Sequence, residues 1–233
     1  MLREGVGRSG KRTTNSDSRA VERSCRAGCL VFVDIETGGI ELHRPIVQIA
    51  AIAVDEHLEE KESFEVKIQF DEARACSDAL RRIHYRRADW KRDSMSEQKA
   101  CWGFANFLRK YAAVEIHGRD WTTFTVAQLV CHNAEFDGPF LRKWFERLGV
   151  FMPASYRIFC TLQRAYWYFC EHPDSPPPDD FRLGTLCNYF GIPLGKHDAH
   201  EAQADVRATL QLYRVLAKSR SRTFTSESSS KPT

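Results

Sequence analysis

The feature that most constrains this chain is an apolar run, residues 29–33, that leads into two acidic residues, Asp34 and Glu36. Because side chains alternate across a strand, a strand through this run places both carboxylates on one face. Two carboxylates at the end of a buried strand are costly, since each loses its hydration and each repels the other. A divalent cation removes that cost, and magnesium and manganese prefer oxygen ligands. The pair therefore predicts a metal site, although a lone Asp-x-Glu is more often a solvated strand edge or a turn.

A third carboxylate follows the next apolar segment. Residues 126–131 read as a second buried strand, and Asp137 comes shortly after it, before the helical pattern of residues 138–148. Asp137 thus stands where a strand gives way to a helix. Taken alone, it reads as a helix N-cap. Together with the first pair, it favours a site for metal-assisted cleavage of a phosphodiester.

The last acidic candidate lies near the C-terminal end of the part of the chain that is rich in apolar residues. Asp198 and Glu201 have the spacing of a capping box, which predicts a helix that starts close to Ala199. Asp205 then falls in the first two turns, where the helix dipole favours negative charge. A surface position is the alternative interpretation of this residue.

Three short motifs occur in order along the chain: Asp-x-Glu-Thr at 34–37, His-Asn-x-x-Phe-Asp at 132–137 and His-x-Ala-x-x-Asp at 200–205. They resemble the motifs of the DEDDh, or DnaQ-like, 3′→5′ exonucleases. That family includes the proofreading subunit of bacterial DNA polymerase III, ribonuclease T and oligoribonuclease. Each motif alone has a high false-positive rate, but three in order at domain-sized spacing are strong support.

The resemblance implies four metal-ligating carboxylates and one general base. The carboxylates are Asp34, Glu36, Asp137 and Asp205, the base is His200, and the cofactors are two divalent ions, Mg²⁺ or Mn²⁺. Two such ions can hold the attacking and leaving oxygens, while a histidine is suited to take a proton from water. His197 is the rival base, but the fifth residue after it is Ala202, whereas the fifth after His200 is Asp205.

Contacts with the substrate are expected around the first strand. Thr37, Gly38 and Gly39 are predicted to form a turn that lets the terminal nucleotide approach the backbone, with an ordinary tight turn as the alternative. The resemblance implies that Ile40 packs on the terminal base and that the pair Ile83 and His84 faces the substrate, although His84 also reads as a surface histidine. Asn133 is expected to hold the active-site loop or to contact the substrate.

The hydrophobic pattern predicts an α/β fold with a mixed sheet flanked by helices. A turn at residues 59–61 makes the first three strands an antiparallel meander, and helices between the later strands imply parallel pairing. The resemblance implies the ribonuclease H-like fold. The expected strands are 29–35, 45–55, 61–69, 126–131 and 156–160, and the expected helices are 97–111, 138–148, 161–170, 183–190 and 199–217.

Charge and composition divide the chain into three parts. Residues 1–28 hold seven Lys or Arg against three Asp or Glu, and residues 217–233 hold four against one. We expect a disordered basic N-terminal segment at 1–28, an exonuclease domain at 29–217 and a disordered C-terminal tail at 218–233. The basic tails would attract a phosphate backbone weakly, or have no role.

One internal segment, residues 81–92, is strongly basic. It carries six Lys or Arg, interleaved with Tyr85 and Trp90. This pattern resembles surfaces that bind single strands through charge and base stacking. A solvated charged face is the alternative.

Cysteine usage predicts an intracellular protein. The chain has 233 residues, 42% of them hydrophobic, which is enough for a sizeable core without disulfides. Cys131, Cys160 and Cys187 stand in apolar surroundings and are expected to be buried, reduced thiols, as in the cytoplasm. No apolar run approaches the ~20 residues that cross a bilayer, so we expect no membrane partner.

Three functions are weighed. The first is a 3′→5′ exonuclease that releases nucleoside 5′-monophosphates from single-stranded DNA ends, with a separate polymerase as partner in any proofreading role. The second is the same chemistry on RNA, which would require tolerance of the 2′-hydroxyl. The third is a non-catalytic nucleic-acid-binding module, which the presence of all five catalytic residues makes the weakest.

Overall fold

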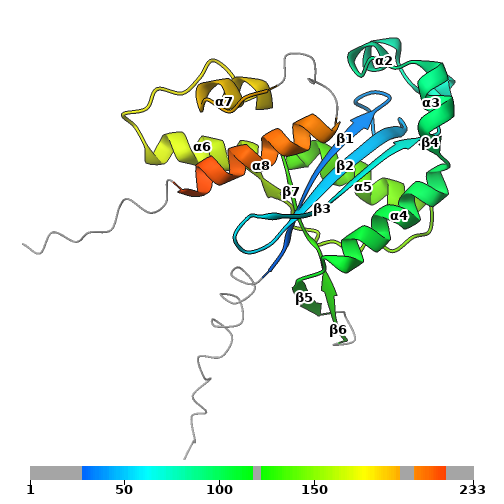
Figure 1. Cartoon of the computed structure of the whole chain (residues 1–233), viewed down its shortest axis with the longest axis horizontal. Coiled ribbons are helices and arrows are strands. Elements are labelled where there is room, and N and C mark those ends of the chain that lie inside the picture. Colours follow the sequence, from blue (N-terminus) through cyan, green and yellow to red (C-terminus); the bar gives the residue numbers. More distant parts are fainter. Residues whose placement is uncertain (1–27, 118–121, 195–201, 219–233) are drawn as a thin grey trace, which may run out of the picture.

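The computed structural model describes residues 28–117, 122–194 and 202–218, and it shows a sheet with helices on both faces (Figure 1). The sheet has six strands in the order β4-β3-β2-β1-β7-β8. Its strands are β1 (Leu30–Thr37), β2 (Ile46–Val54), β3 (Glu60–Ile68), β4 (Ser94–Met95), β7 (Gln128–Cys131) and β8 (Phe159–Cys160). A separate hairpin pairs β5 (Val114–His117) with β6 (Thr123–Val126).

The helices connect these strands and cover the sheet. They are η1 (Glu72–Arg74), α2 (Ser77–Arg82), α3 (Arg87–Asp93), α4 (Glu97–Lys110), α5 (Ala134–Arg147), α6 (Thr161–Glu171), α7 (Leu183–Tyr189) and α8 (Ala202–Lys218). The sequence patterns located α4, α6 and α7 closely, but missed α2, α3 and the β5–β6 hairpin. These missed elements are short, so each contains too few residues to show a clear hydrophobic periodicity.

Strand directions confirm the predicted mixed sheet. β1, β2 and β3 form an antiparallel meander, whereas β7 lies parallel to β1 and β8 lies parallel to β7. The turn between β2 and β3 lies earlier than the predicted 59–61. The Asp55 carboxylate accepts the backbone N–H groups of His57 and Glu59, and this network closes the turn before β3 begins.

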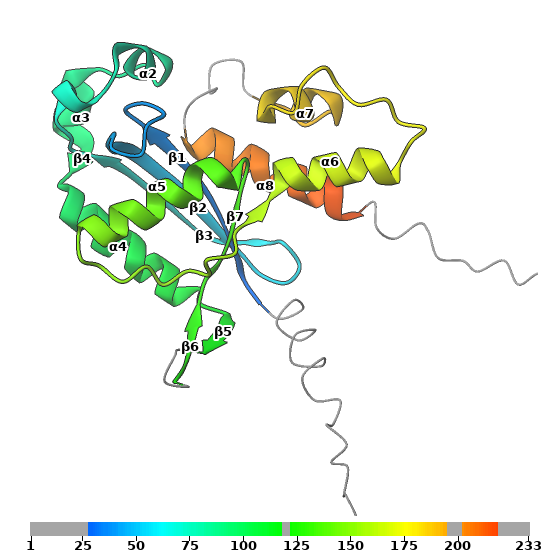
Figure 2. The ribbon, with the colours of Figure 1, turned by 180° about the vertical axis from the view of Figure 1, so that it is seen from behind.

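The core is divided between the two faces of the sheet. On one face, Val31, Val33 and Ile35 of β1 pack with α4 and α5, the helices nearer the viewer in Figure 2. On the other face, Phe32 packs with Val206 and other apolar residues of α8. α6 and α7 then pack against the outer side of α8. Every second residue of β1 therefore faces α8, and this alternation sets the direction of the acidic residues that follow Phe32.

The predicted cysteine environments are confirmed in part. Cys131 and Cys187 are buried, but Cys160 is half-buried, because it belongs to the edge strand β8. Within the described ranges, no helix is both long enough and apolar enough to cross a bilayer. Residues 1–27 and 219–233 lie outside the described residues, so the expected domain limits and tails stay predictions.

Candidate active site

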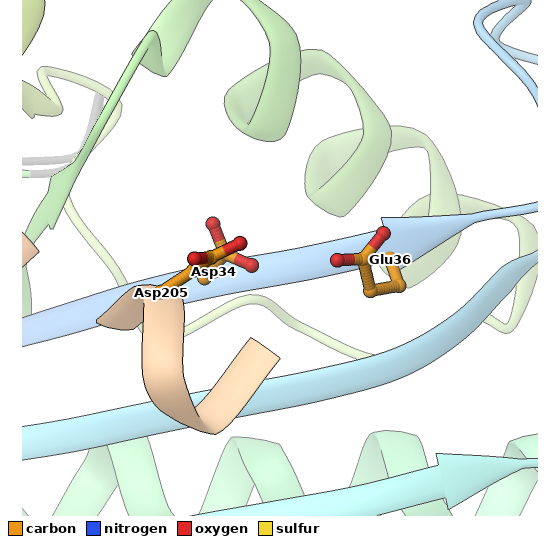
Figure 3. A group of neighbouring side chains, drawn as sticks. All are labelled: Asp34, Glu36 and Asp205. Atoms are coloured by element: carbon orange, nitrogen blue, oxygen red, sulfur yellow. The ribbon is translucent and has the colours of Figure 1, made fainter. Parts of the chain in front are cut away.

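Three carboxylates that are far apart in the sequence converge at the end of β1. Oxygen atoms of Asp34, Glu36 and Asp205 all lie within 4.8 Å of one another. Figure 3 shows the first two on β1 and the third on the first turn of α8. All three side chains are half-buried. The structure thus brings together three of the four carboxylates that the motifs predicted.

Local sequence explains this convergence. Asp34 and Glu36 continue the face of β1 that begins with Phe32, so they point towards α8 rather than towards α5. On α8, Ala202 and Val206 are fully buried against the same face, and they fix the first turn of the helix. Asp205 comes directly before Val206 and is carried to the acidic pair.

The fourth predicted carboxylate, Asp137, reaches the site from α5. Its side chain is only 4% exposed, and backbone N–H groups of Asp137 and Ile35 donate to it. Asp137 is not a helix N-cap, because α5 begins earlier, after Asn133 in a left-handed conformation with φ 60°. Asp137 instead lies in the first turn, where the partial positive charge of the helix N-terminus favours a carboxylate.

Burial and mutual repulsion perturb these acids strongly. Loss of hydration raises the pKa of Asp34 well above its usual range, and the charges of Asp137, Glu36 and Asp205 raise it further. The pKa of Glu36 is raised to about 8, first by burial and then by the charges of Asp205 and Asp137. Burial also raises the pKa of Asp137 to about 8. Without added positive charge, the four acids cannot all be ionised at neutral pH.

This donor set fits hard divalent cations. Among the residues that the structure describes, it offers carboxylate oxygens alone, the ligand type that Mg²⁺ and Mn²⁺ prefer. The raised pKa values of these acids also favour a cation site, because a bound cation would offset the repulsion that raises them. The residues present therefore match the metal requirement of a phosphodiester-cleaving site.

His132 supports the wall of the site without reaching the carboxylates. Its Nε2 donates to the backbone oxygen of Phe181 at 3.1 Å, so its Nδ1 accepts from the Thr161 hydroxyl at 2.9 Å. Burial lowers the pKa of His132 to about 4. The ring is therefore neutral, and it ties the end of β7 to α6 and to the segment before α7.

Two cavities lie beside the carboxylates. The larger, of about 1000 Å³, is lined by Asp205 and by Asn133, one of the predicted substrate contacts. The smaller, of about 360 Å³, is lined by Glu36, Thr37 and Ile40. Because Glu36 and Asp205 belong to one cluster, both cavities border it.

The other predicted contacts are placed less favourably. Gly38 does not line the smaller cavity; its N–H donates to Pro45, and a Cβ here would come within 2.8 Å of the Ala75 side chain. The glycine is therefore required by close packing of the turn. His84 is exposed with φ 50°, and it lines neither cavity, in contrast to its buried neighbour Ile83. The proposed contact of His84 with the substrate stays a prediction.

The expected general base is not tested by the structure. His200, its rival His197 and the predicted capping box lie within residues 195–201, outside the described residues. Their roles stay predictions.

The stacking interpretation of the basic segment 81–92 is wrong. Trp90 is 6% exposed and packs with Val47 and Ile83, while the half-buried Tyr85 lies against Trp90 with ring centroids 5.1 Å apart. Both rings belong to a small core under α2 and α3, so they are not free to stack on bases. Aromatic residues that alternate with charged residues can either stack on bases or pack in a core, and only the tertiary packing decides between the two.

Sequence reasoning missed two residues at the smaller cavity. Phe136 lines it from α5, and Arg82 lines both this cavity and the larger one from the end of α2. Phe136 stands inside the second motif and could have been found there. Arg82 was hidden within a run of six cations, and nothing in that run marks the one that faces the site.

Comparisons with known proteins agree with this geometry. The family model described as Exonuclease matches residues 119–213. DNA polymerase III PolC-type from Oceanobacillus iheyensis is 37% identical over 81 residues, which are 35% of this chain and 5% of the relative. These matches confirm the resemblance to DnaQ-like 3′→5′ exonucleases.

Solved structures confirm the ribonuclease H-like fold. Escherichia coli exonuclease I in complex with a dT13 oligonucleotide matches with a TM-score of 0.65 and 19% identity, over 82% of this chain and 41% of that one. The complex of the same enzyme with a dA16 oligonucleotide matches with a TM-score of 0.64 and 20% identity, over 84% and 42%. The chain thus spans less than half the length of these relatives.

Proposed function

We propose that this protein is a metal-dependent 3′→5′ exonuclease that removes nucleoside 5′-monophosphates from the end of single-stranded DNA. The observation that carries the proposal is the convergence of Asp34, Glu36 and Asp205 within 4.8 Å. A protein that only bound nucleic acid would have no need of a costly acidic cluster, since such a cluster repels phosphate when no metal is bound.

Each catalytic residue has a role in this proposal. Asp34, Glu36, Asp137 and Asp205 hold two divalent cations, Mg²⁺ or Mn²⁺. When bound, these ions supply the positive charge that offsets the charge of the reacting phosphate and activates water for attack. His200 takes the proton from the attacking water, a task that suits a histidine because its intrinsic pKa of about 6.5 lies close to neutral.

Two observations support a single-stranded DNA end as the substrate. The smaller cavity is mainly apolar around Ile40, Ile83 and Phe136, so it suits the base of a terminal nucleotide. The structural relatives include exonuclease I bound to dT13 and dA16. The matched segment of the PolC-type relative is a small part of a polymerase chain, so we take a polymerase as the partner in any proofreading role. The cysteines among the described residues are free thiols, which is consistent with a protein that acts in the cytoplasm.

The test is digestion of 5′-labelled single-stranded DNA and a matched RNA, each with magnesium, with manganese and with chelator. We expect product ladders that shorten from the 3′ end with either metal, faster on DNA, and no cleavage with chelator. Faster cleavage of RNA would replace the DNA assignment with an exoribonuclease. A purified protein that is inert towards both substrates with both metals would refute the catalytic proposal.

A further inference from the structure

Arg82 occupies the boundary between the two cavities. It is the last residue of α2, its side chain is exposed, and it lines the wall of both cavities. Glu36 lines the smaller cavity and Asp205 lines the larger one. Arg82 therefore faces the point where a strand that fills both cavities would pass the carboxylates.

Three of the other arginines in this basic segment are paired elsewhere, and the fourth, Arg86, lines neither of the two cavities. Arg81 pairs with Asp78, Arg87 pairs with Glu72, and Arg92 pairs with Asp93. Arg82 has no ion-pair partner among the residues that the structure describes. Its guanidinium thus remains available to an anion.

Arg82 also lies near the carboxylates. It lines the smaller cavity together with Glu36 and the larger cavity together with Asp205. An arginine that shares both cavities with these carboxylates is also close to any phosphate held beside them.

Resting on the proposed function, we propose that the guanidinium of Arg82 binds the phosphate that joins the 3′-terminal nucleotide to the rest of the strand. The terminal nucleoside would fill the smaller cavity and the preceding nucleotides the larger one. Their shared phosphate then lies between the acidic cluster and Arg82. The planar guanidinium can donate two parallel N–H bonds to phosphate oxygens, which fixes the position of the phosphate as well as its charge.

The chain supplies a matched control. Arg81 is the adjacent residue on the same short helix. Its side chain is also exposed to solvent, and it is paired with Asp78. Arg82→Ala and Arg81→Ala remove the same side chain from neighbouring positions, and Arg82→Lys keeps the charge but loses the bidentate geometry. Thermal unfolding of each variant checks that the fold is retained.

Two measurements test the proposal. Turnover of 5′-labelled oligo(dT) with magnesium should fall by about 100-fold in Arg82→Ala, the effect of removing one donor to a reacting anion. Arg82→Lys should fall less, and Arg81→Ala should stay within about two-fold of wild type. Binding of a non-hydrolysable analogue of the same oligonucleotide at a fixed magnesium concentration, followed by fluorescence anisotropy over a salt series, should lose about 0.7 from its logarithmic salt slope in Arg82→Ala alone.

The outcomes separate this inference from the proposed function. If wild type cleaves and Arg82→Ala matches Arg81→Ala in both rate and salt slope, the Arg82 contact is refuted while the exonuclease proposal stands. If wild type does not cleave, the exonuclease proposal fails, and the salt slope still decides whether Arg82 binds phosphate. An equal loss of slope in Arg81→Ala would mean general attraction by the helix and would also overturn the contact.

Discussion

At the scale of single residues, Asp34 illustrates a conflict between stability and function. It stands in a buried strand beside three other acids, and its pKa is raised by burial and by their charges. A carboxylate that destabilises the folded protein and yet lies within the acidic cluster is best explained by a ligand that it binds.

Asp34→Asn is expected to reduce activity strongly and to stabilise the metal-free protein. The amide keeps the shape of the carboxyl but removes its charge, so turnover should fall by about 1000-fold. In chelator at alkaline pH, the loss of repulsion should raise Tm by about 2–4 °C. Both effects can be measured on one preparation, by digestion and by thermal unfolding. A variant that cleaves at the wild-type rate would remove Asp34 from the metal site.

The general base gives a second prediction at this scale. His200→Ala should keep its affinity for metal and oligonucleotide but lose about 100- to 10 000-fold in turnover, because only proton transfer is removed. The matched control is His197→Ala, which should remain near wild type. Single-turnover digestion together with oligonucleotide binding distinguishes the two. If His197→Ala is the variant that loses turnover, the base assignment moves to His197.

At the scale of elements, His132 joins three segments that frame the larger cavity. Because its pKa is about 4 in the folded protein and about 6.5 in the unfolded chain, the unfolded chain binds more protons between these values. Its contribution to stability is therefore full above pH 6.5 and is lost as pH falls towards 4. The total loss is roughly 3 kcal/mol by proton linkage.

A comparison of variants isolates this effect. Denaturant unfolding of wild type and His132→Asn over this pH range should show that the stability advantage of wild type shrinks as the pH falls. His57→Asn, at an exposed turn, should follow the wild-type profile. A constant difference between wild type and His132→Asn at every pH would mean that the ring is not held neutral.

At the scale of the whole molecule, the acidic cluster couples folding to metal. Glu36 and Asp137 have pKa values of about 8 when folded, against about 4 when unfolded. Groups with raised pKa values make the folded state bind more protons, so the metal-free protein loses stability as pH rises from about 4 to about 8. A cation bound only by the folded state opposes this loss.

Thermal unfolding with and without magnesium tests the coupling. The rise in Tm on adding magnesium should be larger at pH 8 than at pH 5, because more of the carboxylates must be ionised at the higher pH. The double variant Glu36→Gln, Asp137→Asn should lose most of this pH-dependent rise. An equal rise at both pH values would contradict the electrostatic account of the cluster.

The sequence by itself determined the order of the main strands and helices and the identity of the acidic residues. Alternation along β1 was enough to predict that Asp34 and Glu36 share a face, because strand geometry fixes the direction of side chains locally. Apolar patterns were also sufficient for the mixed sheet. The short helices α2 and α3 and the β5–β6 hairpin were missed, because their patterns are too short to read.

Only the tertiary structure decided which residues meet. The packing of Val206 on the sheet brings Asp205 to β1, although more than half of the chain separates them. Packing also decided that Trp90 belongs to a core and that Arg82 faces the cavities. Neighbouring residues with similar side chains differ in the direction in which those side chains point. That direction depends on contacts between segments that are distant in the sequence.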